Sequence, residues 1–227
     1  MDNRVDFDKF TSSYNNLLNQ ETRFFSSNEE YFARYKVEIV RQQVSSSVNR
    51  LLEYGCGIGR NIPFLQQAFS GAEIVGSDIS NASLDVARRD NMGVDFVQEC
   101  GDVTSMEPFD LIFVAGVFHH VPLELRPQVT RTLFERLSPG GTLFVFEHNP
   151  FNPVTRRIVS NCPYDEDAVL LKPSELIKLL VQAGFSVQRK AYCLFVPSKL
   201  SLLARLESRL GWLPLGGQYW IQAKRFP

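Results

Sequence analysis

The sequence lacks the features that would place it in several common protein classes. A net charge of −1 over 227 residues gives no general electrostatic attraction to nucleic acid, although it leaves room for a local basic patch. The four cysteines are scattered without a Cys-x-x-Cys pair, so we expect neither a disulfide framework nor a bound metal. No apolar run is long enough to span a bilayer. The first seven residues lack the apolar core of a signal peptide, so we expect a cytoplasmic protein.

The composition present is that of an ordinary globular protein. Hydrophobic residues make up 44% of the chain and charged residues 22%. The length fits one sizeable domain, and the sequence contains no internal repeat, low-complexity tract or linker. We therefore expect one main domain over residues 50–227, preceded by a helical cap over residues 1–49.

From residue 50 onward, strand patterns alternate with helix patterns. The expected strands are 50–54, 72–77, 94–99, 109–115, 142–147, 185–196 and 218–225. The expected helices are 61–69, 81–90, 123–137 and 173–183, and Ser80 is a plausible N-cap of the second of these. Repeated β-α-β units predict a parallel sheet with helices on both faces. The polar residues that follow these strands should then gather at one edge of the sheet.

Two segments do not fit the alternating pattern. Residues 150–172 form a long connection that leaves the ligand-binding edge, and we expect it to be a substrate lid. Arg156 and Arg157 in this segment are either contacts for a phosphate or carboxylate or part of a solvated helix face. The stretch 200–212 has leucines at helical spacing, which pack on the sheet, on a second subunit or against lipid. The chain is thus compatible with a monomer, a homodimer or peripheral membrane contact.

The most informative motif is a glycine-rich turn after the first strand. It runs Glu53-x-Gly55-x-Gly57-x-Gly59, followed by Arg60. Glycine lets a ligand lie against bare backbone because it has no Cβ and tolerates positive φ. A dinucleotide fingerprint would place Gly or Ala where Arg60 stands, and the acid at Glu53 would repel a pyrophosphate. The motif instead suits a ligand that carries an ammonium group.

With its glycine spacing and preceding acid, this turn resembles motif I of the class I S-adenosylmethionine-dependent methyltransferases. The resemblance covers roughly residues 50–150 and, less specifically, the C-terminal hairpin. It implies a Rossmann-like α/β fold with a seven-stranded, mostly parallel sheet and a C-terminal antiparallel hairpin. It also implies S-adenosylmethionine as cofactor and S-adenosylhomocysteine as product. The cofactor-binding residues that it implies are Tyr14, Glu53, Gly55, Cys56, Gly57, Arg60, Asp78, Ile79, Asp102, Val103 and Ala115.

Within that resemblance, each residue has an expected contact. Glu53 would accept hydrogen bonds from the methionine ammonium, and Asp78 from both ribose hydroxyls. Ile79 would lie on the adenine face, and Asp102 would accept from the adenine amino group. Asp78 alone does not discriminate, because dinucleotide enzymes use an acid in the same way. Either aspartate can instead cap the turn that follows it.

All three histidines of the chain lie at predicted strand ends. His119 and His120 follow the strand 109–115, and His148 follows the strand 142–147. A hydroxyl acceptor needs a base, and histidine titrates near neutral pH, so His119 and His148 are the candidate catalytic residues. Histidines at 119–120 can equally serve only to hold a loop. Glu147 is expected either to bind substrate or to orient His148.

These observations favour methyl transfer to an oxygen or nitrogen of a small molecule. The segment that follows Glu147 loosely resembles that of methyltransferases associated with bacterial cell-surface glycan or lipid-linked sugar pathways. This resemblance suggests a sugar or glycolipid precursor as one class of acceptor. A nucleic-acid base methyltransferase is disfavoured, because residues 115–118 lack the Pro-Pro signature of amino-methylating enzymes. Two alternatives remain: a non-catalytic S-adenosylmethionine-binding protein, and a nicotinamide-dependent oxidoreductase.

Overall fold

The structure is a computed structural model that describes residues 30–99, 107–196, 207 and 209–226. A single sheet of seven strands runs through the described part, in the order β3-β2-β1-β4-β5-β7-β6. The strands are β1 (Arg50–Tyr54), β2 (Glu73–Asp78), β3 (Asp95–Gln98), β4 (Phe109–Ala115), β5 (Leu137–His148), β6 (Ser186–Cys193) and β7 (Gln218–Lys224). The first five pair in parallel, and β7 lies antiparallel between β5 and β6. The predicted α/β class, sheet and C-terminal hairpin are confirmed.

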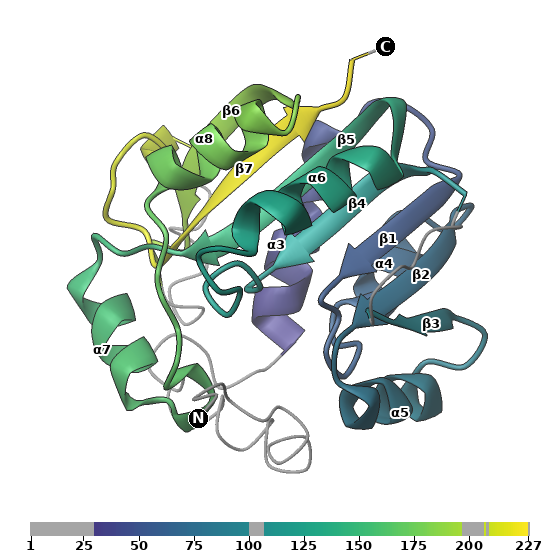
Figure 1. Cartoon of the computed structure of the whole chain (residues 1–227), viewed down its shortest axis with the longest axis horizontal. Helices are drawn as coiled ribbons and strands as arrows, with labels where there is room; N and C mark the ends of the chain where they lie inside the picture. Colours follow the sequence, from purple (N-terminus) through teal and green to yellow (C-terminus); the bar gives the residue numbers. More distant parts are fainter. Residues whose placement is uncertain (1–29, 100–106, 197–206, 208, 227) are drawn as a thin grey trace.

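Helices cover both faces of this sheet (Figure 1). They are α3 (Glu30–Gln43), α4 (Ile62–Ala68), α5 (Asn81–Asp90), α6 (Arg126–Arg136), α7 (Pro153–Asn161) and α8 (Pro173–Gln182). One core cluster joins α3, α4 and α5 to one face of the sheet through residues such as Val40, Leu65 and Leu84. The other joins α6 and α8 to the opposite face through Leu133, Leu176 and Leu180. None of the helices in the described ranges is long and apolar enough to cross a membrane.

The apolar runs explain why the central strands are buried on both sides. In β4, Leu111, Ile112, Phe113 and Val114 have no exposed surface, and they alternate between the two core clusters. Such a continuous run is typical of a parallel strand covered by helices. The carboxyl ends of β1, β2, β4 and β5 therefore have rigid support, and they carry the candidate site.

Most elements lie within three residues of their predicted bounds, and the largest differences are at β5 and in the segment 150–172. The prediction started the fifth strand at Thr142 and treated the preceding Ser-Pro-Gly-Gly as a helix stop, but β5 begins at Leu137. Leu137 pairs with Phe109, and a register shift then brings Thr142 opposite Leu111, with Gly140 at φ +84°. The turn residues thus form a bulge within the strand rather than a loop before it.

The second difference lies in the segment 150–172, which we expected to be a long loop. It contains α7 and a short 3-10 helix, η1 (Pro163–Asp165). The Asn152 side chain caps α7 by accepting hydrogen bonds from the Val154 and Thr155 amides, and Pro153 occupies the first helical position. Whether this segment acts as a lid stays a prediction, as does the cap over residues 1–49, of which the structure describes residues 30–49.

Candidate active site

The glycine turn after β1 is fastened to the end of β2 by backbone hydrogen bonds. The amides of Gly55 and Cys56 both donate to the Ser77 carbonyl, at 2.7 and 2.9 Å. Gly55 has φ +71°, and a Cβ there would come within 2.3 Å of the Val117 side chain. Glycine is therefore required both by the backbone conformation and by the close approach of the turn after β4.

Gly57 differs from its neighbours because it faces open space. Its φ is +53°, and nothing lies within 4 Å of the position that a Cβ would occupy. Its amide donates to Asp78 Oδ2 at 2.7 Å, so the peptide is held without any side chain above it. A ligand can lie against bare backbone here, as the sequence predicts.

Glu53 lies in β1 and is almost fully buried at 1% exposure. Its Oε1 accepts a hydrogen bond from the Asn61 side-chain amide at 2.5 Å. Its Oε2 has no hydrogen-bond partner among the described residues. Burial raises the pKa of Glu53 to about 8, although Asn61 and the Lys36 ammonium oppose the increase. A buried acid with one unused oxygen is a ready acceptor for a cationic ligand group.

Asp78, the last residue of β2, accepts backbone hydrogen bonds on both oxygens. Oδ1 accepts from the Ser80 amide at 3.0 Å and Oδ2 from the Gly57 amide. Burial raises its pKa, while these backbone bonds lower it. Asp78 therefore caps the following turn, the alternative open from the sequence, and each oxygen keeps a further lone pair for a ligand. Next to it, Ile79 is 57% exposed, as a residue meant to contact a flat ring would be.

The remaining predicted cofactor residues divide into two groups. Tyr14, Asp102 and Val103 lie outside the described residues. Arg60 lies partly exposed in the glycine turn, and Ala115 ends β4 at the same sheet edge. Cys56 is buried, and burial raises the pKa of its thiol. The cofactor roles of these residues stay predictions.

Two residues at this site had no signal in the sequence. Asn61 precedes α4 and donates to Glu53 rather than capping the helix. Lys36, on α3, faces Glu53 and Glu147, and burial lowers its pKa against the pull of these acids. Only the packing of α3 against the sheet brings Lys36 to the site, so a search for motifs could not find it.

The carboxyl ends of β4 and β5 carry the histidines and Glu147. Glu147 is buried, and its Oε1 accepts from the amides of Val117 and Phe118 at 3.0 and 2.7 Å. Its Oε2 accepts from His119 Nδ1 at 2.7 Å. Glu147 therefore hydrogen-bonds His119, whereas the sequence suggested His148 as the ring that it would orient; its role at the substrate stays a prediction.

The two candidate bases differ in protonation. Burial alone would lower the pKa of His119, but the carboxylates of Glu147 and Asp165 outweigh it and raise the pKa to about 9. Burial and the neighbouring His119 lower the pKa of His148 to about 4. The two rings are 4.8 Å apart, centroid to centroid. At neutral pH and without a bound ligand, His148 is the ring of this pair that can accept a proton.

Beside the histidines, α7 and η1 border a surface hollow of about 940 Å³. Arg156, Arg157 and Asp165 are among the residues that line it. Both arginines are exposed, so they belong to a solvated helix face that also faces this hollow. Asp165 connects the hollow to the histidines, because it lies within ion-pair distance of both His119 and His120.

Comparisons with known proteins agree with this arrangement. A family model described as a methyltransferase domain matches residues 51–141. A trans-aconitate 2-methyltransferase from Rhizobium leguminosarum is 30% identical over 109 residues, which cover 48% of this chain and 42% of that protein. A ubiquinone biosynthesis O-methyltransferase from Chromobacterium violaceum is 26% identical over 81% of this chain and 84% of that protein.

The fold has counterparts among solved structures. A methyltransferase from Archaeoglobus fulgidus superposes with a TM-score of 0.70, covering 93% of this chain and 99% of that chain at 14% identity. This likeness shows the fold alone. The chain spans less than half the length of the Rhizobium protein. Residues 51–141 thus match a methyltransferase domain, and the strand order of the described sheet agrees with the fold of an S-adenosylmethionine-dependent methyltransferase of known structure.

Proposed function

We propose that this chain is an enzyme that methylates an oxygen atom of a small molecule, with S-adenosylmethionine as the methyl donor. The observation that carries the proposal is the buried Glu53 carboxyl, whose Oε2 has no partner among the described residues, beside the open backbone at Gly57. A nicotinamide cofactor would bring a pyrophosphate to this acid and is disfavoured. The ammonium group of a ligand would supply the hydrogen-bond donor that Glu53 Oε2 lacks among the described residues.

The residues present fit the methionine and ribose ends of such a cofactor. Glu53 would hold the ammonium, the backbone at Gly57 would lie against the methionine, and the free lone pairs of Asp78 would accept from the ribose hydroxyls. Ile79 would cover the adenine. S-adenosylmethionine supplies a methyl group already activated on a sulfonium, so the protein mainly aligns the acceptor and excludes water.

An oxygen acceptor is favoured by the state of His148. A hydroxyl must lose its proton as the new bond forms, and His148 is neutral and lies beside His119 at the end of β5. His119 is already held by Glu147, so we assign it a positioning role. One of the relatives is named an O-methyltransferase, which agrees with this choice of acceptor atom.

The first experiment measures ligand binding to the purified chain by calorimetry. S-adenosylmethionine and S-adenosylhomocysteine should bind, and NADH should not. Glu53→Gln should raise the Kd for S-adenosylmethionine at least about tenfold, because it removes a charge-assisted contact. Glu73→Gln, an exposed acid at the start of β2, is the matched control and should bind as the wild type does. Binding of NADH alone would refute the proposal.

The second experiment asks for turnover. S-adenosylhomocysteine formation is followed with sugars, glycolipid precursors and trans-aconitate, alongside amine acceptors of similar size. With an accepted substrate, His148→Gln should lower kcat by about 10²–10⁴-fold, the range for loss of a general base, while cofactor binding is retained. An unchanged kcat would remove His148 from the mechanism, and turnover of amines only would change the acceptor atom to nitrogen.

A further inference from the structure

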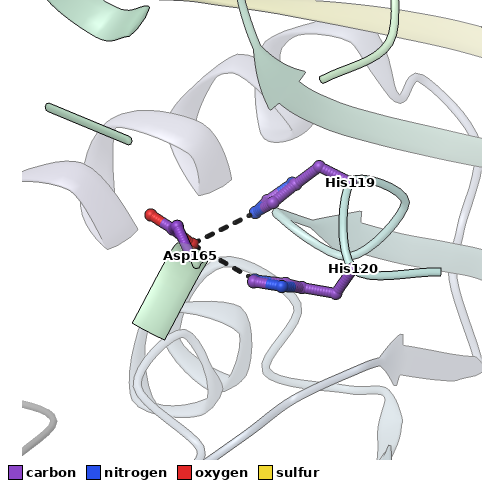
Figure 2. A group of neighbouring side chains, drawn as sticks. All are labelled: His119, His120 and Asp165. Carbon is purple, nitrogen blue, oxygen red and sulfur yellow. Dashed lines mark ion pairs between the residues drawn. The ribbon is translucent and has the colours of Figure 1, made fainter. Parts of the chain in front are cut away.

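Three potential metal ligands converge from two distant segments of the chain. His119 and His120 come from the turn after β4, and Asp165 comes from η1, more than forty residues later. Figure 2 shows both rings pointing toward the Asp165 carboxylate, with the two ion pairs drawn as dashed lines. Asp165 Oδ1 lies 3.7 Å from His119 Nε2 and 3.3 Å from His120 Nε2. The three ligand atoms all lie within 4.8 Å of one another.

These spacings suit a common divalent ion with little rearrangement. An ion bound by imidazole nitrogen and carboxylate oxygen at about 2.0–2.2 Å holds neighbouring ligand atoms roughly 3–3.5 Å apart. The two distances to Asp165 already lie close to this range. Since all three ligand atoms lie within 4.8 Å of one another, a bound ion would have to draw the cluster together by about 1 Å at most places.

His119 also has the outer partner that a metal-bound imidazole usually has. His119 Nδ1 donates to Glu147 Oε2 at 2.7 Å, and His120 Nδ1 lies 3.5 Å from Asp167 Oδ1. A carboxylate on Nδ1 fixes the tautomer in which Nε2 carries the lone pair, and it makes that nitrogen a better donor to a cation. For His119 this hydrogen bond leaves Nε2 facing Asp165 Oδ1, and the His120 ring also has its Nε2 toward the same oxygen.

The cluster is preassembled by backbone contacts that do not involve the proposed ligand atoms. The Val169 amide donates to the His119 carbonyl at 2.8 Å. The Arg126 guanidinium donates to the carbonyls of Val121 and Val169, at 2.9 and 2.8 Å. These bonds tie the segment that bears Asp165 to the turn that bears the histidines, so a cation would not have to order either one.

The local charge also favours a cation. Three carboxylates, those of Glu147, Asp165 and Asp167, face two imidazoles within this small, largely buried region. With both imidazoles neutral the three carboxylates give a formal charge of −3, and the positive charges of Lys36 and Arg126 interact with Glu147. Carboxylates withdrawn from water require a compensating cation, either a proton on an imidazole or a metal ion.

We propose that His119, His120 and Asp165 form a binding site for one divalent transition-metal ion such as Zn²⁺. Two imidazoles and one carboxylate are the ligand types that Zn²⁺ accepts, and three protein ligands leave a coordination position open. Asp165 also lines the hollow beside α7, so the proposed site borders the space that an acceptor could enter.

The metal site itself does not depend on the methyltransferase proposal, but its use in catalysis does. An acceptor hydroxyl in the open position would have its pKa lowered by the metal ion, and its proton would pass to His148.

The test is titration of the EDTA-treated and dialysed full chain with Zn²⁺ by calorimetry, and with Co²⁺ by visible absorption. We expect one ion per chain with a Kd in the micromolar range or below. Asp165→Asn and His120→Gln should each raise the Kd for Zn²⁺ by about 100-fold or more, since even the loss of a residue that only supports a metal ligand lowers metal affinity about 10–100-fold. Glu166→Gln, which removes an exposed carboxylate next to Asp165, should bind Zn²⁺ as the wild type does.

The outcomes separate the two proposals. Absence of Zn²⁺ binding, or equal binding by wild type and Asp165→Asn, would overturn the metal site and leave the cluster as a protonated hydrogen-bond network. Thermal melts of the metal-free variants show whether they fold, and His120→Gln gives a second test if Asp165→Asn does not. S-adenosylmethionine titration of the same samples tests the proposed function independently, because Glu53 and Gly57 are not among the metal ligands.

Discussion

The Glu53 carboxyl makes stability depend on pH in a direction opposite to that of an ordinary surface acid. Its folded pKa is about 8, against an ordinary value of 4.5, so the folded chain keeps a proton that the unfolded chain releases between these pH values. The stability from this group is complete below pH 4.5 and is lost as the pH rises through 8. Urea unfolding at pH 5.5, 7 and 8.5 should show this loss, at up to about 1.4 kcal/mol per pH unit.

The control for this prediction is Glu53→Gln, which cannot ionise but can still accept from Asn61. Between pH 4.5 and 8, the free energy of unfolding of this variant should not show the decrease that Glu53 causes in the wild type.

Binding of the cofactor should shift the protonation of Glu53 in the opposite direction, because an ammonium group favours the ionised acid. Calorimetry in two buffers of different ionisation enthalpy should detect a proton released by wild type at pH 6.5 and none by Glu53→Gln. Equal proton release would contradict the assigned contact.

A substitution at Gly57 tests whether the open space at this residue is needed for ligand binding rather than for folding. Alanine at this position would adopt a left-handed conformation, at a cost of roughly 1–2 kcal/mol, and would place a methyl group in the space left for the ligand. Gly57→Ala should therefore fold and yet bind S-adenosylmethionine at least about tenfold more weakly. Gly71 also has open space around its Cβ position, without a positive φ, so Gly71→Ala is the matched control and should bind normally.

Site residues were predictable from the sequence where the fold places them at strand ends. Glu53 and Asp78 end or nearly end parallel strands, and parallel strands bring such residues to one edge. Lys36 and Asp165 reach the same region only through the packing of α3 and η1, which no local pattern encodes. The partner of Glu147 was likewise hidden, because strand order alone does not say which histidine turns toward it.

At the scale of elements, α5 depends on one side chain at its start. Ser80 Oγ accepts a hydrogen bond from the Ser83 amide at 3.0 Å in a buried position, which confirms the predicted N-cap. Ser80→Ala leaves that amide unsatisfied and should lower the free energy of unfolding by about 1 kcal/mol. Urea denaturation measures this loss, and the exposed Ser70→Ala should change stability by less than about 0.5 kcal/mol. Equal values for the two variants would show that the cap contributes nothing.

Elements with a clear local pattern have the predicted bounds, and those shaped by neighbours do not. The limits of β1, α5 and β4 match the prediction residue for residue. The early start of β5 escaped prediction because Leu137 becomes a strand residue only by pairing with Phe109. The sequence around α7 is rich in turn residues, so its Asn-Pro start suggested a loop, although Asn152 and Pro153 form a helix cap.

Across the whole molecule, a buried carboxylate connects the first described helix to the last third of the chain. Glu207 is buried and accepts from the amides of Phe195 and Val196, both at 2.8 Å. The Tyr35 hydroxyl, on α3, donates to its other oxygen. Burial and the Glu207 carboxylate raise the pKa of Tyr35, so its hydroxyl keeps the proton that it donates. The contact spans 172 residues of sequence and fixes the helix that carries Lys36.

Removing this contact should destabilise the chain as a whole. Tyr35→Phe takes one partner from a buried carboxylate, which should lower the free energy of unfolding by about 1.5–3 kcal/mol. Glu207→Gln keeps the shape but removes the charge, and a double-mutant cycle with Tyr35→Phe isolates the pair. We expect a coupling of at least about 0.5 kcal/mol in urea unfolding, the lower limit for residues in contact. Additive losses would mean that α3 is held by its apolar face alone, through Val37 and Val40, and that the position of Lys36 does not depend on the C-terminal segment.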